Sequence, residues 1–220
     1  MVYTLIMSRY KVKKIYTWSN KLAYLAGLFA SDGCLLSNGR HLNITSKDLQ
    51  IIASCQEILN KNTKIGTKYG QFKTKAFYWQ FSDVALYDFF LNAGIEPRKS
   101  KSIKQVSVPD QYWGDFLRGY FDGDGTTYGY LDKRWPNARM FYTGFISGSL
   151  DMLNWIAYKN RNLLHTNGSS IRKGARADSL VYAKSDSIKI YKSMYGEDTA
   201  YKKYSLDRKR IKLSNFIIQG

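Results

Sequence analysis

The sequence is poor in the features that mark membrane, secreted and cysteine-stabilised proteins. Only two of its 220 residues are cysteine and three are proline, which excludes a disulfide framework and a four-cysteine zinc site. Its longest apolar run covers residues 22–30, whereas a membrane-spanning helix needs ~20 residues. Basic residues follow a short apolar stretch at the N-terminus, the reverse of a secretory signal. We therefore expect an intracellular protein of a reducing compartment, the cytoplasm or an organelle matrix, with Cys34 and Cys55 as buried thiols.

Acidic residues are also scarce. There are 17 Asp and Glu against 34 Lys and Arg, a formal net charge of +17, while an apolar content of 44% excludes a disordered chain. Residues 1–110 carry 16 basic and 7 acidic side chains, so the excess is not held in one tail. The charge indicates a polyanionic partner. A solubilising surface is the plainer interpretation, and an acidic membrane is disfavoured because no Lys-rich amphipathic helix is present.

The chain repeats itself at a constant offset of 92 residues. Segment 22–33 aligns with segment 114–125, and a strand pattern, a serine and an amphipathic segment follow each copy. Each half is predicted to form a helix, two strands, a helix, two strands and a helix. With Pro109 at the junction, the sequence predicts two similar units, 1–108 and 109–220, in one compact pseudo-symmetric monomer.

Small residues recur on one face of each repeated helix. Gly27 and Ser31 are one turn apart in the first copy, and Gly119 and Gly123 are one turn apart in the second. A glycine inside a helix costs about 1 kcal/mol relative to alanine. Its use in both helices therefore favours an interface in which the two helix backbones are in close contact.

Close packing of these helices would bring Asp32 and Asp124, at their ends, side by side. A carboxylate at a helix C-terminus is disfavoured by the helix dipole and by a second carboxylate beside it. A divalent cation is the natural compensation, and paired acids with a metal on a basic protein indicate phosphodiester hydrolysis. The plainer interpretation, an Asp-Gly pair that only ends a helix, is favoured for one copy but not for two equivalent copies.

The nonapeptides LAGLFASDG at 25–33 and LRGYFDGDG at 117–125 resemble the paired signatures of a single-chain LAGLIDADG homing endonuclease. Both copies keep the final aspartate, and they depart from the family pattern at Ala30, Ser31, Arg118 and Tyr120. The resemblance implies an α+β (mixed α/β) fold of two αββαββα units related by a pseudo-twofold axis. Its two four-stranded antiparallel sheets would form a DNA-binding saddle. The implied activity is site-specific, metal-dependent DNA cleavage that leaves a staggered double-strand break in a long asymmetric target.

The same resemblance implies the residues of the active site. The implied metal ligands are Asp32, Asp124, Ser31 and Gly123. We expect Mg²⁺, with Mn²⁺ able to substitute and Ca²⁺ able to support binding without efficient cleavage. The implied basic catalytic residues are Lys47, Lys99 and Lys209. Lys47 has no counterpart in the second unit, where Gly148 stands, and a plain phosphate contact or a solvated charge is the alternative role for each lysine.

Base recognition is expected from strand residues that face away from the helices, because side chains alternate between the two faces of a strand. Arg, Asn and Gln carry the paired donors and acceptors that recognise base edges. The expected DNA-binding residues are Asn38, Arg40, His41, Asn43, Tyr78 and Gln80 in the first unit and Tyr128, Tyr130, Tyr142 and Arg172 in the second. Sheet packing is the alternative for the tyrosines, and a surface position is the alternative for His41 and His165. We expect a monomer that binds double-stranded DNA and does not bind a membrane.

Other classes of protein stay open. A non-cleaving DNA-binding regulator or an RNA maturase could use the same fold, although retention of both aspartates favours cleavage. An enzyme carried within an intein is disfavoured because the chain starts with Met and has no terminal His-Asn. An open reading frame inside an intron, or a free-standing one, fits better.

Overall fold

The computed structural model describes residues 14–70, 73–131, 139–196 and 203–219. The first half contains α1 (Asn20–Ser31), β1 (Gly33–Leu35), β2 (His41–Ser46), α2 (Leu49–Leu59), β3 (Gly66–Tyr69), β4 (Lys75–Ser82) and α3 (Val84–Asn92). The second half contains α4 (Trp113–Asp124), β5 (Gly125–Leu131), β6 (Arg139–Ser147), α5 (Leu150–Leu164), β7 (Ser170–Arg172), β8 (Asp178–Tyr182), α6 (Lys184–Tyr195) and α7 (Asp207–Gln219). One order of seven elements thus occurs twice, with α7 added at the end. No helix within the described ranges is both long enough and apolar enough to cross a membrane.

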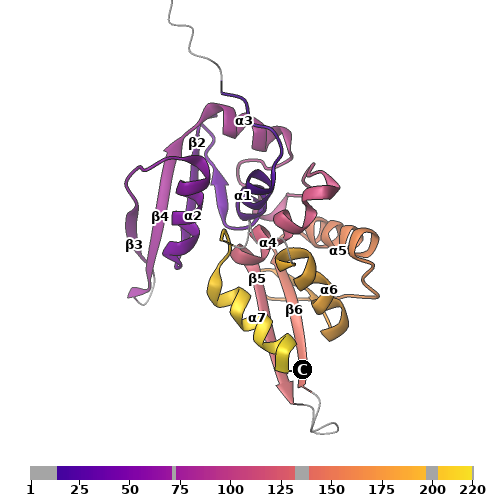
Figure 1. Ribbon diagram of the computed structural model, residues 1–220. Helices are drawn as coiled ribbons and strands as arrows, with labels where there is room; N and C mark the ends of the chain where they lie inside the picture. The colour runs from indigo at the N-terminus through magenta and orange to yellow at the C-terminus, as the bar shows by residue number, and fades with distance from the viewer. Residues whose placement is uncertain (1–13, 71–72, 132–138, 197–202, 220) are drawn as a thin grey trace, which may run out of the picture.

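The two sheets have the same strand order. The first runs β1-β2-β4-β3 and the second runs β5-β6-β8-β7, and the strands pair antiparallel throughout. Figure 1 shows the strands of the first sheet at the left, β5 and β6 at the lower right, and α1 and α4 in the middle of the molecule. The predicted mixed α/β fold with two four-stranded antiparallel sheets is confirmed. The division of the chain at residue 108 stays a prediction.

Each sheet has one face packed against helices and one open face. In β2, Leu42 and Ile44 are buried, whereas His41 and Asn43 are partly exposed. In β6, Phe141 and Phe145 are buried, whereas Tyr142 and Ile146 are partly exposed. Because successive side chains of a strand point to opposite faces, the apolar residues form a core with the helices and the polar residues form an accessible surface.

Helices α1 and α4 pack in backbone contact. A Cβ atom on Gly27 would lie 2.1 Å from the carbonyl oxygen of Phe116, and one on Gly119 would lie 2.0 Å from that of Tyr24. No side chain fits at either distance, so glycine allows the two backbones to touch. Ser19 begins α1 by accepting a hydrogen bond from the backbone N–H of Leu22. The contact places the ends of both helices at one locus.

The expectation of two buried thiols is wrong for one cysteine. Cys34 is exposed, whereas Cys55 is buried in α2. In the short edge strand β1, Gly33 and Leu35 face the core, so the intervening side chain must face the open side. Burial raises the pKa of the Cys55 thiol to about 12.

Candidate active site at the ends of two packed helices

The two aspartates lie at the carboxyl ends of α1 and α4. Asp32 is the C-cap residue of α1, and Asp124 is the last residue of α4. A Cβ atom on Gly123 would lie 3.4 Å from the carboxyl carbon of Asp32, so this side chain packs against the opposite helix. Burial and the charge of Asp124 raise the pKa of Asp32 to about 6, and burial raises the pKa of Asp124. The packing therefore concentrates negative charge where two helix dipoles already disfavour it.

A lysine covers the carboxyl end of each helix. Lys99 donates hydrogen bonds to the carbonyl oxygens of Ser31 (3.2 Å) and Gly33 (2.7 Å). Lys209 does the same at α4 over distances of 2.8 and 2.7 Å, the shorter of them to Gly123. The two ammonium charges offset part of the rise in the pKa of both aspartates, while burial lowers the pKa of each lysine. The lysines thus stabilise the helix ends and offset part of the negative charge.

The oxygen atoms at the helix ends suit a hard divalent cation. Among the described residues, no group donates a hydrogen bond to the carboxylate of Asp32 or Asp124. The carbonyl oxygens of Ser31 and Gly123 accept from lysines, but each keeps a second lone pair. The described part of the chain contains no group of three or more His, Cys, Asp and Glu that could hold a metal. A cation here would have two carboxylates and main-chain oxygens as ligands, and would keep several waters, as Mg²⁺ does.

Lys47 lines the same hollow as Asp32. This hollow has a volume of about 320 Å³, and its charged lining residues are Asp32, Lys47, Asp48, Asp122 and Arg208. Arg208 is held there by two hydrogen bonds to Asp48, of 2.8 and 2.7 Å. At the equivalent place in the second unit, a Cβ atom on Gly148 would lie 2.6 Å from the carbonyl oxygen of Ser100. The surroundings of the two aspartates therefore differ.

A buried charged group on α4 is absent from the sequence-based prediction. Asp122 is 1% exposed and accepts hydrogen bonds from the hydroxyl of Tyr24 (2.9 Å) and the N–H of Leu206 (2.8 Å). Burial raises its pKa to about 6, and its Oδ1 has no partner among the described residues. One turn earlier, Arg118 donates to the carbonyl oxygen of Met194 at 2.9 Å. The signal in the sequence is that α4 carries charges where α1 carries alanines.

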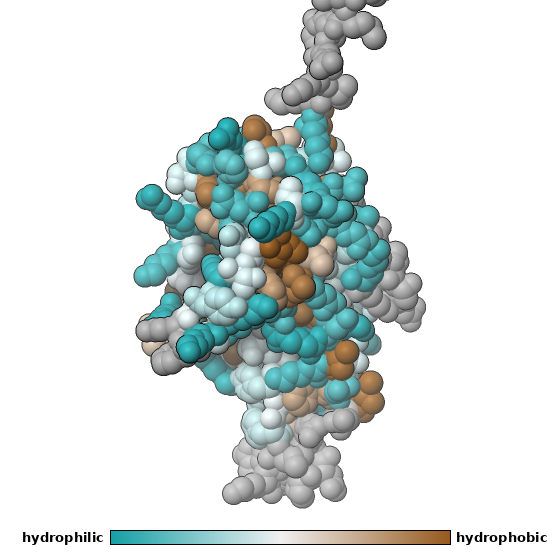
Figure 2. Space-filling model, turned by 90° about the vertical axis from the view of Figure 1, so that its left-hand side faces the viewer, coloured by the Kyte–Doolittle hydropathy of each residue, from teal (hydrophilic) through white to brown (hydrophobic). Residues whose placement is uncertain are grey.

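The first sheet carries polar side chains on its open face. The expected DNA-binding residues on this face are His41, Asn43, Tyr78 and Gln80. Asn43 lies directly opposite Gln80. In the turn between β1 and β2, the amide oxygen of Asn38 accepts from the N–H groups of Arg40 (3.3 Å) and His41 (3.1 Å), so Asn38 shapes the turn. Figure 2, which views the molecule from the left of Figure 1, shows a mostly hydrophilic surface with a small apolar group near its centre.

The second sheet carries aromatic side chains on its open face. Tyr128 lies directly opposite Tyr142, their rings stack with centroids 5.3 Å apart, and Tyr130 lies on the same strand face as Tyr128. Arg172 donates to the hydroxyl of Tyr128 at 2.6 Å. His165 is not part of this surface, since it ends α5 in a left-handed conformation with φ 53°. The two open faces therefore offer different chemistry.

Residues 19–76, from the start of α1 to the start of β4, match the model of the LAGLIDADG-like domain. This segment is similar to LAGLIDADG-like domains. The matched residues include Asp32 and Lys47, and the resemblance to the LAGLIDADG family is confirmed. The second repeat lies outside the matched residues, and its relation to the first rests on the repeated signature and the repeated sheet order. None of the curated proteins matches the sequence.

Solved structures of LAGLIDADG proteins superimpose on both halves of the chain. The homing endonuclease I-WcaI bound to its DNA recognition sequence has a TM-score of 0.60 at 13% identity, over 90% of this chain and 88% of that one. Mesophilic variants of I-DmoI have a TM-score of 0.54 at 19% identity, over 82% and 91%. Full-length DUF199/WhiA from Thermatoga maritima has a TM-score of 0.59 at 13% identity, over 94% and 63%. The present chain therefore spans less than two thirds of that WhiA protein. At such identities, these structures show that the fold is shared.

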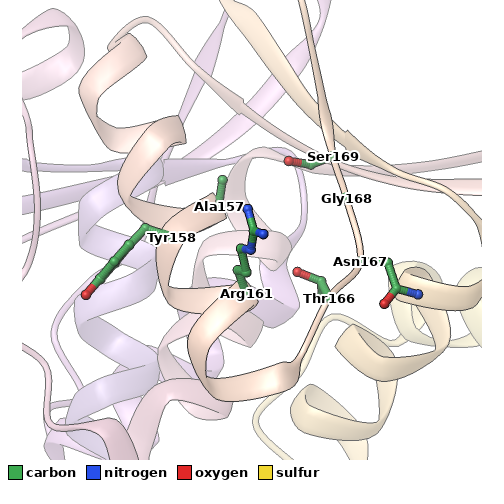
Figure 3. A pocket seen from close by; sticks show the side chains of 7 residues that line it. All are labelled: Ala157, Tyr158, Arg161, Thr166, Asn167, Gly168 and Ser169. Carbon is green, nitrogen blue, oxygen red and sulfur yellow. The ribbon is translucent and has the colours of Figure 1, made fainter.

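A different hollow, of about 360 Å³, lies in the second half of the chain, between α5 and the loop 166–169. Figure 3 shows the side chain of Arg161 running along the helix toward Ala157, while Tyr158 points away from the other labelled side chains. None of the candidate catalytic or metal-binding residues lines it. This hollow therefore plays no part in the site at the helix ends.

Proposed function

We propose that the protein is a site-specific DNA endonuclease that uses a divalent metal to make a staggered double-strand break in a long asymmetric target. The observation that carries this proposal is the pair Asp32 and Asp124, brought together by two helices in backbone contact, with a lysine at each helix end. This arrangement concentrates carboxylate charge that the lysines neutralise only in part, and such a site suits metal-assisted hydrolysis of a phosphodiester.

Mg²⁺ or Mn²⁺ would be held by Asp32 and Asp124, with main-chain oxygens of Ser31 and Gly123 beside them. When bound, such a cation supplies a water of lowered pKa and neutralises charge on the scissile phosphate. A variant of I-DmoI has been solved with its target DNA in the presence of Mn, which is consistent with divalent-metal use in this fold. The raised pKa of Asp32 means that cation binding would compete with protonation near neutral pH.

The basic residues have distinct proposed roles. Lys99 and Lys209 hold the helix ends in place and limit the rise in the pKa of the aspartates, so they favour ionised and positioned carboxylates. Lys47 lies in the hollow that contains Asp32 and would stabilise negative charge on a phosphate there. Arg208 is already paired with Asp48, so its role is to position the wall of this hollow.

The open faces of the two sheets would contact the DNA. Side chains of the open faces, polar on the first sheet and aromatic on the second, alternate along the strands with buried side chains. Such a face can present side chains to base edges in the major groove. The net charge of +17 would attract the phosphate backbone. Because one chain carries both units, 1–108 and 109–220, we propose that a monomer binds the two different halves of an asymmetric site.

The test is a search for cleaved sites in a random or genomic duplex library. The protein is incubated with the library in Mg²⁺, and the new ends are sequenced. The expected result is one family of long sites with staggered ends, absent for the variant Asp32→Asn/Asp124→Asn. In Ca²⁺ the same sites should be bound and not efficiently cut. A library left without new ends in both Mg²⁺ and Mn²⁺ would contradict the proposed activity.

The likeness to WhiA favours one alternative, a DNA-binding regulator that does not cleave. Specific binding of duplex DNA without cleavage in Mg²⁺ or Mn²⁺ would favour that alternative. Specific binding of a structured RNA instead would favour an RNA maturase. A reading frame inside an intron, or a free-standing one in a DNA-containing compartment, is the genetic setting that this proposal expects.

A further inference from the structure

A side-chain contact spans the whole open face of the second sheet. Tyr128 is on β5 and Arg172 is on β7, and these strands are the opposite edges of the sheet. Nevertheless, the guanidinium of Arg172 donates a hydrogen bond to the Tyr128 hydroxyl at 2.6 Å. On the two intervening strands, Gly144 of β6 lies directly opposite Val181 of β8, and a Cβ atom on Gly144 would lie 3.0 Å from a methyl carbon of Thr126. The tip of the arginine therefore lies over the middle of the face and not at its rim.

Stacked tyrosine rings hold this guanidinium in place. The rings of Tyr128 and Tyr142 are nearly parallel, at 17°, and those of Tyr130 and Tyr142 have the same angle with centroids 6.1 Å apart. The Arg172 guanidinium carbon lies 5.8 Å from the centroid of Tyr128 and 5.5 Å from that of Tyr142. A side chain fixed by a hydrogen bond and two cation–π contacts loses less conformational entropy when it binds a ligand.

Within the described ranges, most of the hydrogen-bonding capacity of Arg172 is unused. A guanidinium has five N–H donors, and one of them is engaged by the Tyr128 hydroxyl. Arg172 is exposed, and no carboxylate of the described residues pairs with it. The equivalent open face of the first sheet offers His41, Asn43 and Gln80, none of which has such a charged fork. The second face thus presents one positioned, uncompensated arginine.

We propose that Arg172 is a specificity-determining residue that reads a guanine in the half of the target bound by the second sheet. The proposal rests on the proposed DNA-binding function. Guanine offers two acceptors, O6 and N7, on its major-groove edge, and an arginine fork can bind both at once. Phosphates follow the rims of a groove, whereas base edges form its floor, so a guanidinium over the middle of the face meets bases. Tyr128 is then a positioning residue, because its hydroxyl holds the fork.

The experiment compares base preferences of wild type, Arg172→Lys, Arg172→Gln and Tyr128→Phe. Each protein selects bound duplexes from a pool randomised over the target, in Ca²⁺, and the salt dependence of affinity is measured on the best site. Arg176→Gln is the matched control, because Arg176 is also exposed and lies four residues away. All substituted side chains lie on the surface, so melting temperatures should stay close to wild type.

We expect wild type to prefer guanine at one position of that half-site by roughly 5- to 150-fold, the range for a bidentate pair. Arg172→Lys should lose the preference at that position alone, with an unchanged salt slope because the charge is kept. Arg172→Gln should shift the preference toward adenine, which glutamine can bind through N6 and N7. Tyr128→Phe should weaken the guanine preference and leave the salt slope unchanged. The control should keep the wild-type preferences.

Two results would overturn the inference and one would overturn its basis. A uniform loss of affinity across all sequences for Arg172→Gln, with a salt slope reduced by about one, would make Arg172 a phosphate contact. An unchanged preference profile in Arg172→Lys and Arg172→Gln would exclude any reading role. If wild type selects no duplex at all, the proposed DNA-binding function fails, and this result is distinct because it needs no substitution.

Discussion

Arg208 and Asp48 join the end of the chain to the first unit through two hydrogen bonds, of 2.8 and 2.7 Å. Beside them, the amide of Gln50 donates to the carbonyl oxygen of Ser205 at 2.9 Å. Lys209, which follows Arg208 in the chain, covers the carboxyl end of α4. One short segment therefore connects the packing of α2 in the first unit to a candidate catalytic lysine in the second.

A segment of the first unit makes a corresponding contact with the second unit. The segment that follows Lys99 in the first unit reaches the start of α5 in the second, where Ser149 donates to the carbonyl oxygen of Ile103 at 2.5 Å. Each helix end is thus covered by a segment that also contacts the other unit. Because these contacts cross between the units, displacement of one unit would disturb the lysines of both.

Replacing either aspartate should abolish most cleavage and leave folding intact. Asp32→Asn and Asp124→Asn keep the size of the side chain but remove a metal-binding charge, so cleavage in Mg²⁺ should fall by orders of magnitude. DNA binding in Ca²⁺ should persist, because phosphate contacts lie mainly elsewhere. The measurement is conversion of supercoiled plasmid to nicked and linear forms. Linear product at the wild-type rate from both single variants would contradict the assigned roles.

Enlarging a glycine at the helix contact should destabilise the protein. Gly27→Leu and Gly119→Leu each place a side chain where a backbone carbonyl lies about 2 Å from the Cβ position. Overpacking costs about 1–3 kcal/mol, and more where two helices must separate. Thermal melts should show a clear decrease for both. The matched control is Gly168→Leu, since a Cβ atom there meets nothing within 4 Å. Equal melting temperatures for all three variants would count against this interface.

The free energy of unfolding should depend on the ionisation of Asp32. Its folded pKa of about 6 lies above the ordinary value of 3.8, so the folded state binds a proton more tightly than the unfolded state does. The stability that this group contributes is present at low pH and is lost as pH rises through about 6. Asp32→Asn should therefore melt close to wild type near pH 3.5 in EDTA, gain on wild type as pH rises through about 6, and melt above it by the full margin at pH 7.5. A difference that stays constant over this range would contradict the raised pKa.

Cleavage of the two strands should respond unequally to Lys47. This lysine lines the hollow with Asp32, while Gly148 leaves no room for a lysine near Asp124. Lys47→Met should therefore slow the cutting of one strand more than the other, and nicked plasmid should accumulate. Strand-specific end labels resolve the two rates, with the exposed Lys64→Met as the control for loss of charge. Equal slowing of both strands would show that Lys47 acts on binding alone.

DNA affinity should fall steeply with salt. For ten phosphate contacts, the logarithm of the binding constant should fall with the logarithm of salt concentration with a slope of about −9. The even distribution of positive charge over both halves of the chain motivates this expectation. Fluorescence anisotropy at several salt concentrations measures the slope, and sedimentation of the complex measures its stoichiometry. A shallow slope, or two copies of the chain on one duplex, would contradict a basic monomeric DNA-binding protein.

The sequence by itself determined the features that depend on local periodicity. The offset of 92 residues and the recurring helix and strand patterns predicted two equal sheets, which the structure contains. The one-turn spacing of Gly27 and Ser31, repeated in Gly119 and Gly123, predicted close helices, because small residues one turn apart lie on one helix face. The alternation of side chains along a strand placed Asn43 and Gln80 on one face of the first sheet. These features follow from neighbours in the chain, whose geometry is known once the type of element is known.

Only the tertiary structure decided the features that join distant segments. The capping of α1 by Lys99, the burial of Asp122 against Leu206 and the reach of Arg172 to Tyr128 all connect residues far apart in the chain. No periodic pattern encodes such pairs, because they depend on how the elements pack. The exposure of a thiol predicted to be buried has the same cause: a three-residue strand is too short for its pattern to reveal which face meets the core.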